Sequence, residues 1–110
     1  MTVSIIIKRI VKDEEMALQL APFIVQLRSR AATQPGFLTS QTFSCLDCDG
    51  EYLVISNWHT LEDWNRWMNS DERMTIQKDV DELLGEKTIY RFYEPVVGGI
   101  APQFKLRTES

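Results

Sequence analysis

The sequence holds one histidine, two cysteines, four prolines and five glycines in 110 residues, and it has no long hydrophobic run. Two cysteines are too few for the disulfide scaffold of a small secreted domain. No stretch approaches the ~20 apolar residues that a membrane-spanning helix needs. The opening MTVSIIIKRIV has a short apolar run with no basic region before it, so we predict no secretory signal. These scarcities predict a cytoplasmic protein with reduced thiols.

Basic residues are also in the minority, with 12 Lys and Arg against 16 Asp and Glu and a net charge of −4. Phosphate backbones and anionic lipids are bound by clusters of Lys and Arg, and the sequence has no such cluster. We therefore expect neither nucleic acid nor a membrane among the partners. Hydrophobic residues make up 44% and aromatic residues 10%, which is typical of one folded domain rather than of a disordered chain.

The hydrophobic periodicity predicts four strands and two helical regions. The strands are expected at 3–11, 37–45, 51–58 and 88–97. The first helical region is expected to begin after an Asp13 cap and to end before Pro35. The second runs from a Thr60 cap to Gly85, with a second cap or a break at 70–71.

Three local patterns give further expectations. Pro22 lies inside the first helical region, where its missing N–H predicts a kink or a restart near Ala21. The alternation over 37–45 places Phe37 and Phe43 on the same face of a half-buried strand. The charged stretch 71–82 is typical of a solvated helix face.

The order β-α-β-β-α-β predicts a ferredoxin-like α+β fold, a four-stranded antiparallel sheet with helices on one face. The strands at 3–11, 51–58 and 88–97 carry apolar side chains on both faces, and the chain has no further element to cover the second face. We therefore predict a homodimer with the two sheets packed face to face. The domain is expected at 1–97, and the tail 98–110 is expected to be flexible or packed on the partner subunit.

Three segments resemble a known family. They are Gln34-Pro35-Gly36-Phe37, the run SNWHTLEDWNRW over 56–67, and YRFYEPV over 90–96. Together they resemble the antibiotic biosynthesis monooxygenase (ABM) domain of the dimeric α+β barrel superfamily, over about residues 2–97. The resemblance implies a homodimer whose sheets form a barrel-like core, with a pocket in each subunit between sheet and helices.

The resemblance also implies a function. Some members of the family oxidise polycyclic aromatics with O₂ and without metal or flavin, so it implies a cofactor-independent monooxygenase acting on a small aromatic or quinone-like molecule. No cofactor and no metal are expected. A non-catalytic, small-ligand-binding or stress-associated dimer remains the alternative, and a third interpretation is a pocket filled by its own side chains. An open cavity with a polar group beside a bound ring would favour an enzyme.

Other members degrade haem, and two positions of this sequence argue against that activity. The helix tryptophan of those members corresponds to Trp67, which is present. Their proximal histidine corresponds to Gln77, and their first-strand asparagine corresponds to Lys8. Without an imidazole for the iron, we predict no haem ligation.

The candidate site residues come from the same segments. His59 is the sole imidazole, and His59 and Lys8 are the candidates for moving a proton in catalysis. The candidates for substrate binding are Trp67, Trp64, Asn57 and Tyr90. Arg9 also lies on a predicted strand and is a further polar group for the pocket, although a register error of one residue would reverse its face. The alternative is that Trp64 packs helix against sheet and that His59 is a polar residue at a strand end.

Cys45 and Cys48 have C-x-x-C spacing, but the sequence offers no second pair and no histidine partner for zinc. A redox-active dithiol lies at a helix N-terminus, whereas this pair is predicted at a strand–turn junction beside Asp47 and Asp49, which would raise the thiol pKa. We therefore predict a structural role for the pair and no metal site.

Overall fold

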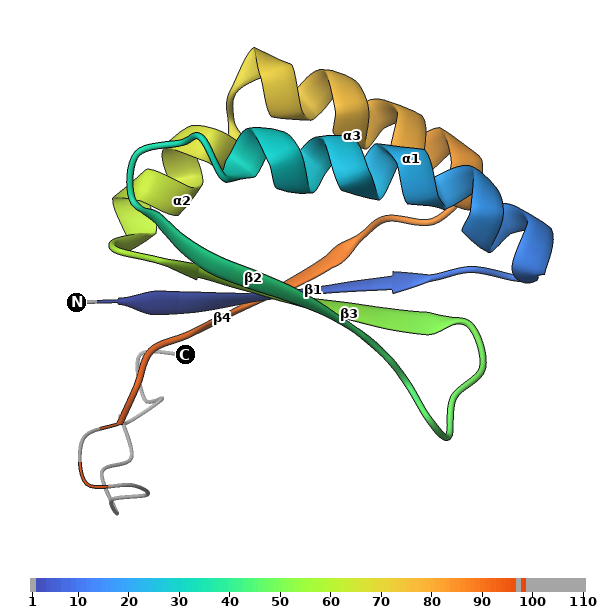
Figure 1. Cartoon of the computed structure of the whole chain (residues 1–110), viewed down its shortest axis with the longest axis horizontal. Coiled ribbons are helices and arrows are strands. Elements are labelled where there is room, and N and C mark those ends of the chain that lie inside the picture. Colours follow the sequence, from blue (N-terminus) through green and yellow to red (C-terminus); the bar gives the residue numbers. More distant parts are fainter. Residues whose placement is uncertain (1, 97, 99–110) are drawn as a thin grey trace, which may run out of the picture.

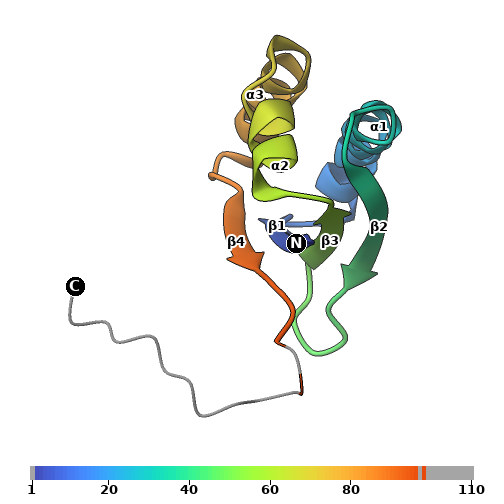
Figure 2. The same cartoon turned by 90° about the vertical axis from the view of Figure 1, so that its left-hand side faces the viewer.

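The computed structural model describes residues 2–96 and 98, and it confirms the ferredoxin-like α+β fold. The elements are β1 (Val3–Ile10), α1 (Glu14–Ala31), β2 (Phe37–Ser44), β3 (Glu51–Trp58), α2 (Leu61–Met68), α3 (Asp71–Leu84) and β4 (Ile89–Tyr93). The sheet order is β2-β3-β1-β4, with antiparallel pairing throughout. All three helices lie on one face of the sheet (Figure 1), with α1 on one side and α2 and α3 on the other (Figure 2). The predicted course of the tail concerns residues 99–110, which lie outside the described residues.

Each helix begins at the cap that the sequence predicts. The side chains of Asp13, Thr60 and Ser70 accept the backbone N–H three residues further on, at 2.8, 3.1 and 3.2 Å. Because Ser70 begins a new helix, the second helical region is divided into α2 and α3. Gly85 ends α3 in the left-handed conformation, with φ of 69°. None of the helices in the described part of the chain is long and apolar enough to span a bilayer.

Helix α1 is one continuous helix that contains Pro22, so the predicted restart near Ala21 is wrong. Proline removes one hydrogen bond, which would have gone to the carbonyl of Leu18. Pro22 is exposed and Leu18 is 70% exposed, so water can satisfy that carbonyl.

Strand β2 has an irregular register at its start, and this changes one expected face. Phe37 pairs with Trp58, and Thr39 pairs with the next residue of β3, Asn57. The ring of Phe37 meets that of Trp58 edge-on at 5.4 Å, on the helix-covered face. Phe43 pairs with Leu53 on the opposite face and is 39% exposed. The prediction that Phe37 and Phe43 share a face is therefore wrong, because a β-bulge shifts the alternation by one residue.

The two faces of the sheet have different surroundings. On the helix-covered face the side chains of Ile5, Val54 and Trp58 are buried in the core. The opposite face, which we call the open face, carries half-buried and exposed apolar side chains: Ile6, Phe43, Leu53, Ile55, Ile89 and Tyr93. No described element covers the open face (Figure 2). The predicted apolar character of the second face is thus present.

Candidate functional site

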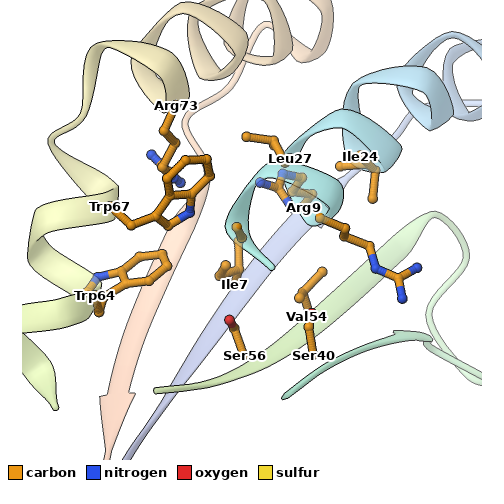
Figure 3. Close-up of a pocket in the computed structure, with 12 residues that line it drawn as sticks. Ile7, Arg9, Ile24, Leu27, Ser40, Val54, Ser56, Trp64, Trp67 and Arg73 are labelled. Atoms are coloured by element: carbon orange, nitrogen blue, oxygen red, sulfur yellow. The ribbon is translucent and has the colours of Figure 1, made fainter. Parts of the chain in front are cut away.

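A cleft lies between α1, α2, α3 and the helix-covered face of the sheet (Figure 3). Its inner cavity has a volume of about 40 Å³. The wall of this inner cavity consists of Ile7, Arg9, Ile24, Leu27, Arg28, Ala31, Ser40, Val54, Ser56, Trp64, Trp67 and Arg73. An outer cavity of about 290 Å³ lies beneath α1 and shares four of these residues, Arg9, Ile24, Arg28 and Val54. The two cavities therefore adjoin.

Two tryptophans form one end of the inner cavity. Trp64 and Trp67 are three residues apart on α2, so both project from the same helical face, and they are 1% and 3% exposed. The Trp64 ring packs against Trp58 with 5.7 Å between centroids and against Tyr90 with 6.1 Å. Figure 3 shows the two indoles together, with Arg73 above Trp67. The cavity thus has the aromatic wall that the sequence predicts.

Two buried arginines meet at this cavity. Arg9 belongs to the helix-facing side chains of β1 and is 5% exposed, and Arg73 lies in the first turn of α3 and is 4% exposed. Their Nη2 atoms donate to one acceptor, Oε1 of Gln77, at 3.4 and 3.3 Å. Arg73 also donates to the Tyr90 hydroxyl, and its guanidinium carbon lies 5.5 Å from the centroid of the Trp64 ring.

Gln77 holds this arrangement in place. Its amide nitrogen donates to Oδ1 of Asp81 and to Oγ1 of Thr88, both at 2.9 Å. Its carbonyl oxygen is shared by the two arginines, so the whole amide is engaged. An amide between two cations does not provide the imidazole that a haem iron requires, and these residues do not fit a haem site.

The inner cavity carries a net positive charge from its arginines. Burial lowers the pKa of Arg9 to about 10; Tyr90 opposes that effect and the nearby charge of Arg73 adds to it. Arg9 is therefore still protonated at neutral pH. Within the described residues neither Arg9 nor Arg73 has a carboxylate within 4.0 Å. The Nε atom of Arg9 and the Nε1 atom of Trp64 are buried without a hydrogen-bond partner in the described part of the chain.

The structure places the predicted site residues in three locations. Trp64 and Trp67 line the cavity, and Tyr90 adjoins it through Arg73. Lys8 and Asn57 lie on the open face, where Lys8 pairs with Leu53 and Ile89, and Asn57 accepts from Ser4 and donates to Thr39 at 2.8 Å. His59 is exposed in the turn before α2, where its backbone N–H donates to the carbonyl of Gly36 at 2.7 Å. Within one chain, Lys8, Asn57 and His59 are not part of the cavity wall.

Sequence reasoning missed Arg73 and underrated Arg9. Arg73 and Gln77 lie between the Glu, Asp and Lys residues of the stretch 71–82, which are expected on a solvated face, but these two side chains are themselves buried. A signal was present, since Arg73, Ile76, Gln77 and Val80 follow the helical spacing of one buried stripe. Arg9 likewise continues the buried set of β1 formed by the odd-numbered residues.

The cysteine pair lies at the hairpin between β2 and β3, at the end of the sheet far from α2 (Figure 1). The ligand atoms of Cys45, Cys48 and Glu51 lie within 4.8 Å of one another, and the Sγ atom of Cys45 lies 3.1 Å from Oδ1 of Asp47. Hydrogen bonds with Cys48 and then with Asp47 raise the pKa of Cys45 to about 12.

A comparison with protein families identifies the chain. Residues 3–79 match the family model described as antibiotic biosynthesis monooxygenase. The chain belongs to the ABM family. Among curated protein sequences, none matches this ABM protein at a significant level.

Solved structures share the fold of this ABM protein. Rv0793 from Mycobacterium tuberculosis superposes with a TM-score of 0.76 at 13% identity, covering 91% of this chain and 100% of that one. SnoaB, a cofactor-independent oxygenase from Streptomyces nogalater, gives a TM-score of 0.75 at 16% identity, covering 93% and 98%. A conserved protein from Methanosarcina mazei gives 0.75 at 16% identity, covering 84% and 90%. At these identities the likeness extends to the fold alone.

Proposed function

We propose that this ABM protein is a cofactor-independent monooxygenase of a small aromatic or quinone-like molecule, and that the substrate binds in the cleft between α1, α2 and the sheet. The observation that carries the proposal is the pair of adjoining cavities: the outer one, of about 290 Å³, has room for a ring system, and the inner one ends at Trp64 and Trp67. Support comes from the family and from the fold shared with SnoaB, which is a cofactor-independent oxygenase.

The reaction needs an electron-rich anion that can react with O₂. For an anthrone, the ring CH₂ loses a proton, the carbanion is oxidised by O₂ to a peroxide, and the peroxide loses water to leave a carbonyl. Anthrone and O₂ thus give anthraquinone and H₂O, and the substrate itself supplies the electrons. Trp67 forms the inner end of the cleft and limits how far the substrate enters, and the positive charge of the wall favours the deprotonated substrate.

The proton acceptor is part of the same proposal. His59 and Lys8 are the candidates from the sequence, and in one chain both lie outside the cavity wall. We therefore assign the proton to a water molecule in the outer cavity, which opens beside the exposed Arg28. A role for His59 or Lys8 would require relay through such water.

Oxygen uptake in the presence of anthrones and hydroquinones tests this function. Wild type should consume O₂ faster than buffer, and Trp67→Ala should lose at least about tenfold in kcat/KM, since the buried indole forms the inner end of the cleft and fixes the position of the substrate there. Trp67→Phe keeps a ring and should retain more activity than Trp67→Ala. Arg30→Gln is the matched control: Arg30 is exposed, pairs with Glu72 of α3 at 2.9 Å and lies outside both cavity walls. Uptake no faster than in buffer for every substrate would contradict the proposal.

A second candidate function is ligand binding without catalysis. It is favoured by the composition of the described cavity wall, which contains neither a carboxylate nor an imidazole to act as general base. In that case the aromatic compounds would bind and raise the melting temperature while O₂ uptake stayed at the buffer rate. The same titration therefore separates the two candidates.

We also propose that the protein is a homodimer joined through the open faces of two sheets. The support is the set of apolar side chains that one chain leaves exposed or half-buried there, among them the exposed Phe43 and Ile89 and the half-buried Ile55. Burying an apolar sheet face against a second copy removes it from water, and a twofold axis makes one patch complementary to itself.

A further inference from the structure

The inner cavity is a patch of positive charge inside an acidic protein. The chain carries 16 Asp and Glu and a net charge of −4. The wall of the inner cavity nevertheless holds three arginines, Arg9, Arg28 and Arg73, and no acidic residue. Such a wall repels a cationic ligand and attracts an anionic one.

The two buried arginines lack a compensating charge. A buried guanidinium is costly unless it is paired or fully hydrogen-bonded. Here Arg9 and Arg73 share one neutral acceptor, the Oε1 atom of Gln77, at 3.4 and 3.3 Å, and Arg73 has a second neutral acceptor in the Tyr90 hydroxyl. The nearby carboxylate of Asp81 is reached through the amide of Gln77 rather than directly. The Nε atom of Arg9, on a side chain only 5% exposed, has no acceptor among the described residues. These donors need an anionic acceptor.

The sizes of the two cavities indicate the shape of that ligand. A water molecule needs about 10–15 Å³ of such space, so the inner cavity has room for a group of about three heavy atoms but not for a ring. The outer cavity, at about 290 Å³, has room for a ring system, and its wall includes the apolar residues Ala17, Leu20 and Val25. The ligand thus has a small charged group inside and an apolar body beneath α1.

We infer that the cavity binds a small aromatic carboxylic acid, with its carboxylate between Arg9 and Arg73 and its ring system in the outer cavity. Two oxygen atoms on one planar group suit the paired donors of arginine, and such charge-assisted hydrogen bonds are the stronger ones. The Nε atom of Arg9 is the donor left free for one of these oxygens. The exposed Arg28, where the two cavities adjoin, adds a positive charge along the path into the site.

This inference deepens the proposed function, on which it rests in taking the same cleft as the substrate site. Binding of the acid requires no oxygen and no turnover, so the two statements can fail separately. If an aromatic acid binds at Arg9 and Arg73 but no compound promotes O₂ uptake, the anion site stands and the oxygenase proposal fails. If neutral anthrones are oxidised but aromatic acids do not bind, the oxygenase proposal stands and the anion site fails.

The test is a binding titration of the wild-type chain with 2-naphthoate, 2-naphthamide and 2-naphthol, followed by calorimetry and by thermal shift. The three probes share one ring system, and only the first is a carboxylate at neutral pH. We expect 2-naphthoate to bind at least about tenfold more tightly than either neutral probe, because the charge-assisted hydrogen bonds are lost in the neutral probes. Chloride at high concentration should weaken the binding of 2-naphthoate alone.

Variants locate the site. Arg9→Gln and Arg73→Gln should each weaken 2-naphthoate binding at least about tenfold and leave 2-naphthol binding within about twofold. Arg9→Lys keeps the charge without the paired donors and should lie between Arg9→Gln and wild type. Arg30→Gln, with Arg30 outside both cavity walls, should bind as wild type does.

Equal affinity of the wild-type chain for 2-naphthoate and 2-naphthamide would overturn the inference, and this comparison needs no variant to fold. Undiminished 2-naphthoate binding by folded Arg9→Gln and Arg73→Gln would also overturn it. Binding of 2-naphthoate that no cavity variant changes would place the acid elsewhere on the surface.

Discussion

The two faces of the sheet differ: one buries charged side chains, and the other exposes apolar ones. In folded proteins, charged side chains are usually exposed and large apolar side chains are usually buried, so each face departs from this rule. The helix-covered face is buried, yet two arginines and a glutamine lie between it and the helices: Arg9 on β1, and Arg73 and Gln77 on α3. The open face is exposed in one chain, yet it carries Phe43, Ile55 and other apolar residues. Polar groups in a core and apolar groups on a surface both cost free energy unless a partner meets them. The comparison leads to the two proposals made above, that one face is arranged for a ligand and the other for a second copy of the chain.

The largest expected effect is on the helix-covered face. Trp58 is 0% exposed, and its Nε1 atom donates to Ser56 Oγ at 2.8 Å. Trp58→Ala should reduce the free energy of unfolding by about 3–5 kcal/mol, because it removes a buried indole and leaves a cavity. Phe43→Ala on the open face is the counterpart and should cost about 1 kcal/mol or less in the folding of one chain.

Urea unfolding at a fixed protomer concentration measures both changes, since association contributes to apparent stability. Equal losses in Trp58→Ala and Phe43→Ala would mean that the two faces are buried alike. That result would remove the contrast between them.

The next effect concerns association through the open face. Ile55 lies at the centre of that face, where it pairs with Ile6 and Gln41. Wild type should sediment at twice the chain mass at micromolar concentration, and Ile55→Glu should sediment at the mass of one chain, because two like charges would face each other across the interface. Gln26→Glu adds the same charge on the exposed side of α1 and should leave the dimer intact. A wild-type chain that sediments as a monomer would contradict the use assigned to the open face.

A smaller effect is expected at the helix that carries the aromatic wall. Thr60→Ala removes the cap of α2 and should cost about 1 kcal/mol of unfolding free energy. Binding of 2-naphthoate should weaken in parallel, because α2 positions Trp64 and Trp67 in the wall of the inner cavity, where its carboxylate is expected. Chemical denaturation and the binding titration measure the two changes. Ser29→Ala, on the exposed surface of α1, serves as the comparison. A fully stable Thr60→Ala would show that tertiary packing alone holds α2.

The stability that Asp63 contributes at the same cap should fall as the solution becomes acidic. A hydrogen bond from Thr60, and then the hydrogen bond and charge of Arg66, lower the pKa of Asp63 below its ordinary value of 3.8, although desolvation opposes them. A lowered pKa in the folded chain contributes stability above the unfolded value, and that stability is lost as the pH falls below about 4 through the folded value. Asp63→Asn should flatten that part of the pH–stability curve. Urea titrations between pH 5 and pH 2.5 measure the free energy of unfolding of both chains. The same loss of stability in Asp63→Asn as in wild type would contradict this role.

The sequence predicts features that involve residues close together in the chain better than it predicts contacts between distant segments. The caps at Asp13, Thr60 and Ser70 involve residues three apart, and the sequence predicts all of them. The fold follows because the apolar periods are long and consistent. The bulge after Phe37 was missed because the burial of its ring against Trp58 overrides strict alternation.

The site shows the same limit. Trp64 and Trp67 could be predicted from their spacing on one helix, together with the family resemblance. The meeting of Arg9 with Arg73 could not, because it joins β1 to α3 across 64 positions, and only the packed fold fixes that distance. The spacing within each element places Arg9 and Arg73 among buried neighbours, but it does not say that the two side chains meet.

The smallest effect is expected at the hairpin, away from both faces. The thiol of Cys45 has its pKa raised to about 12, so it is protonated at pH 8 and should react slowly with iodoacetamide. Hydrogen bonds with Cys48 and Asp47 raise this pKa, so Cys48→Ser and Asp47→Asn should each lower it and speed the alkylation of Cys45 at pH 8. Neither substitution should change the binding of 2-naphthoate. Mass spectrometry of the modified peptide follows the rate. Rapid alkylation of Cys45 in the wild type would contradict the raised pKa.

A crystal structure of the chain with 2-naphthoate tests most directly whether the two faces are used differently. We predict the carboxylate within hydrogen-bond distance of Arg9 and Arg73, the rings beneath α1, and the open faces of two chains against each other. Finding 2-naphthoate on the open face, or an empty cleft in which the two arginines contact carboxylates of their own chain, would contradict the account.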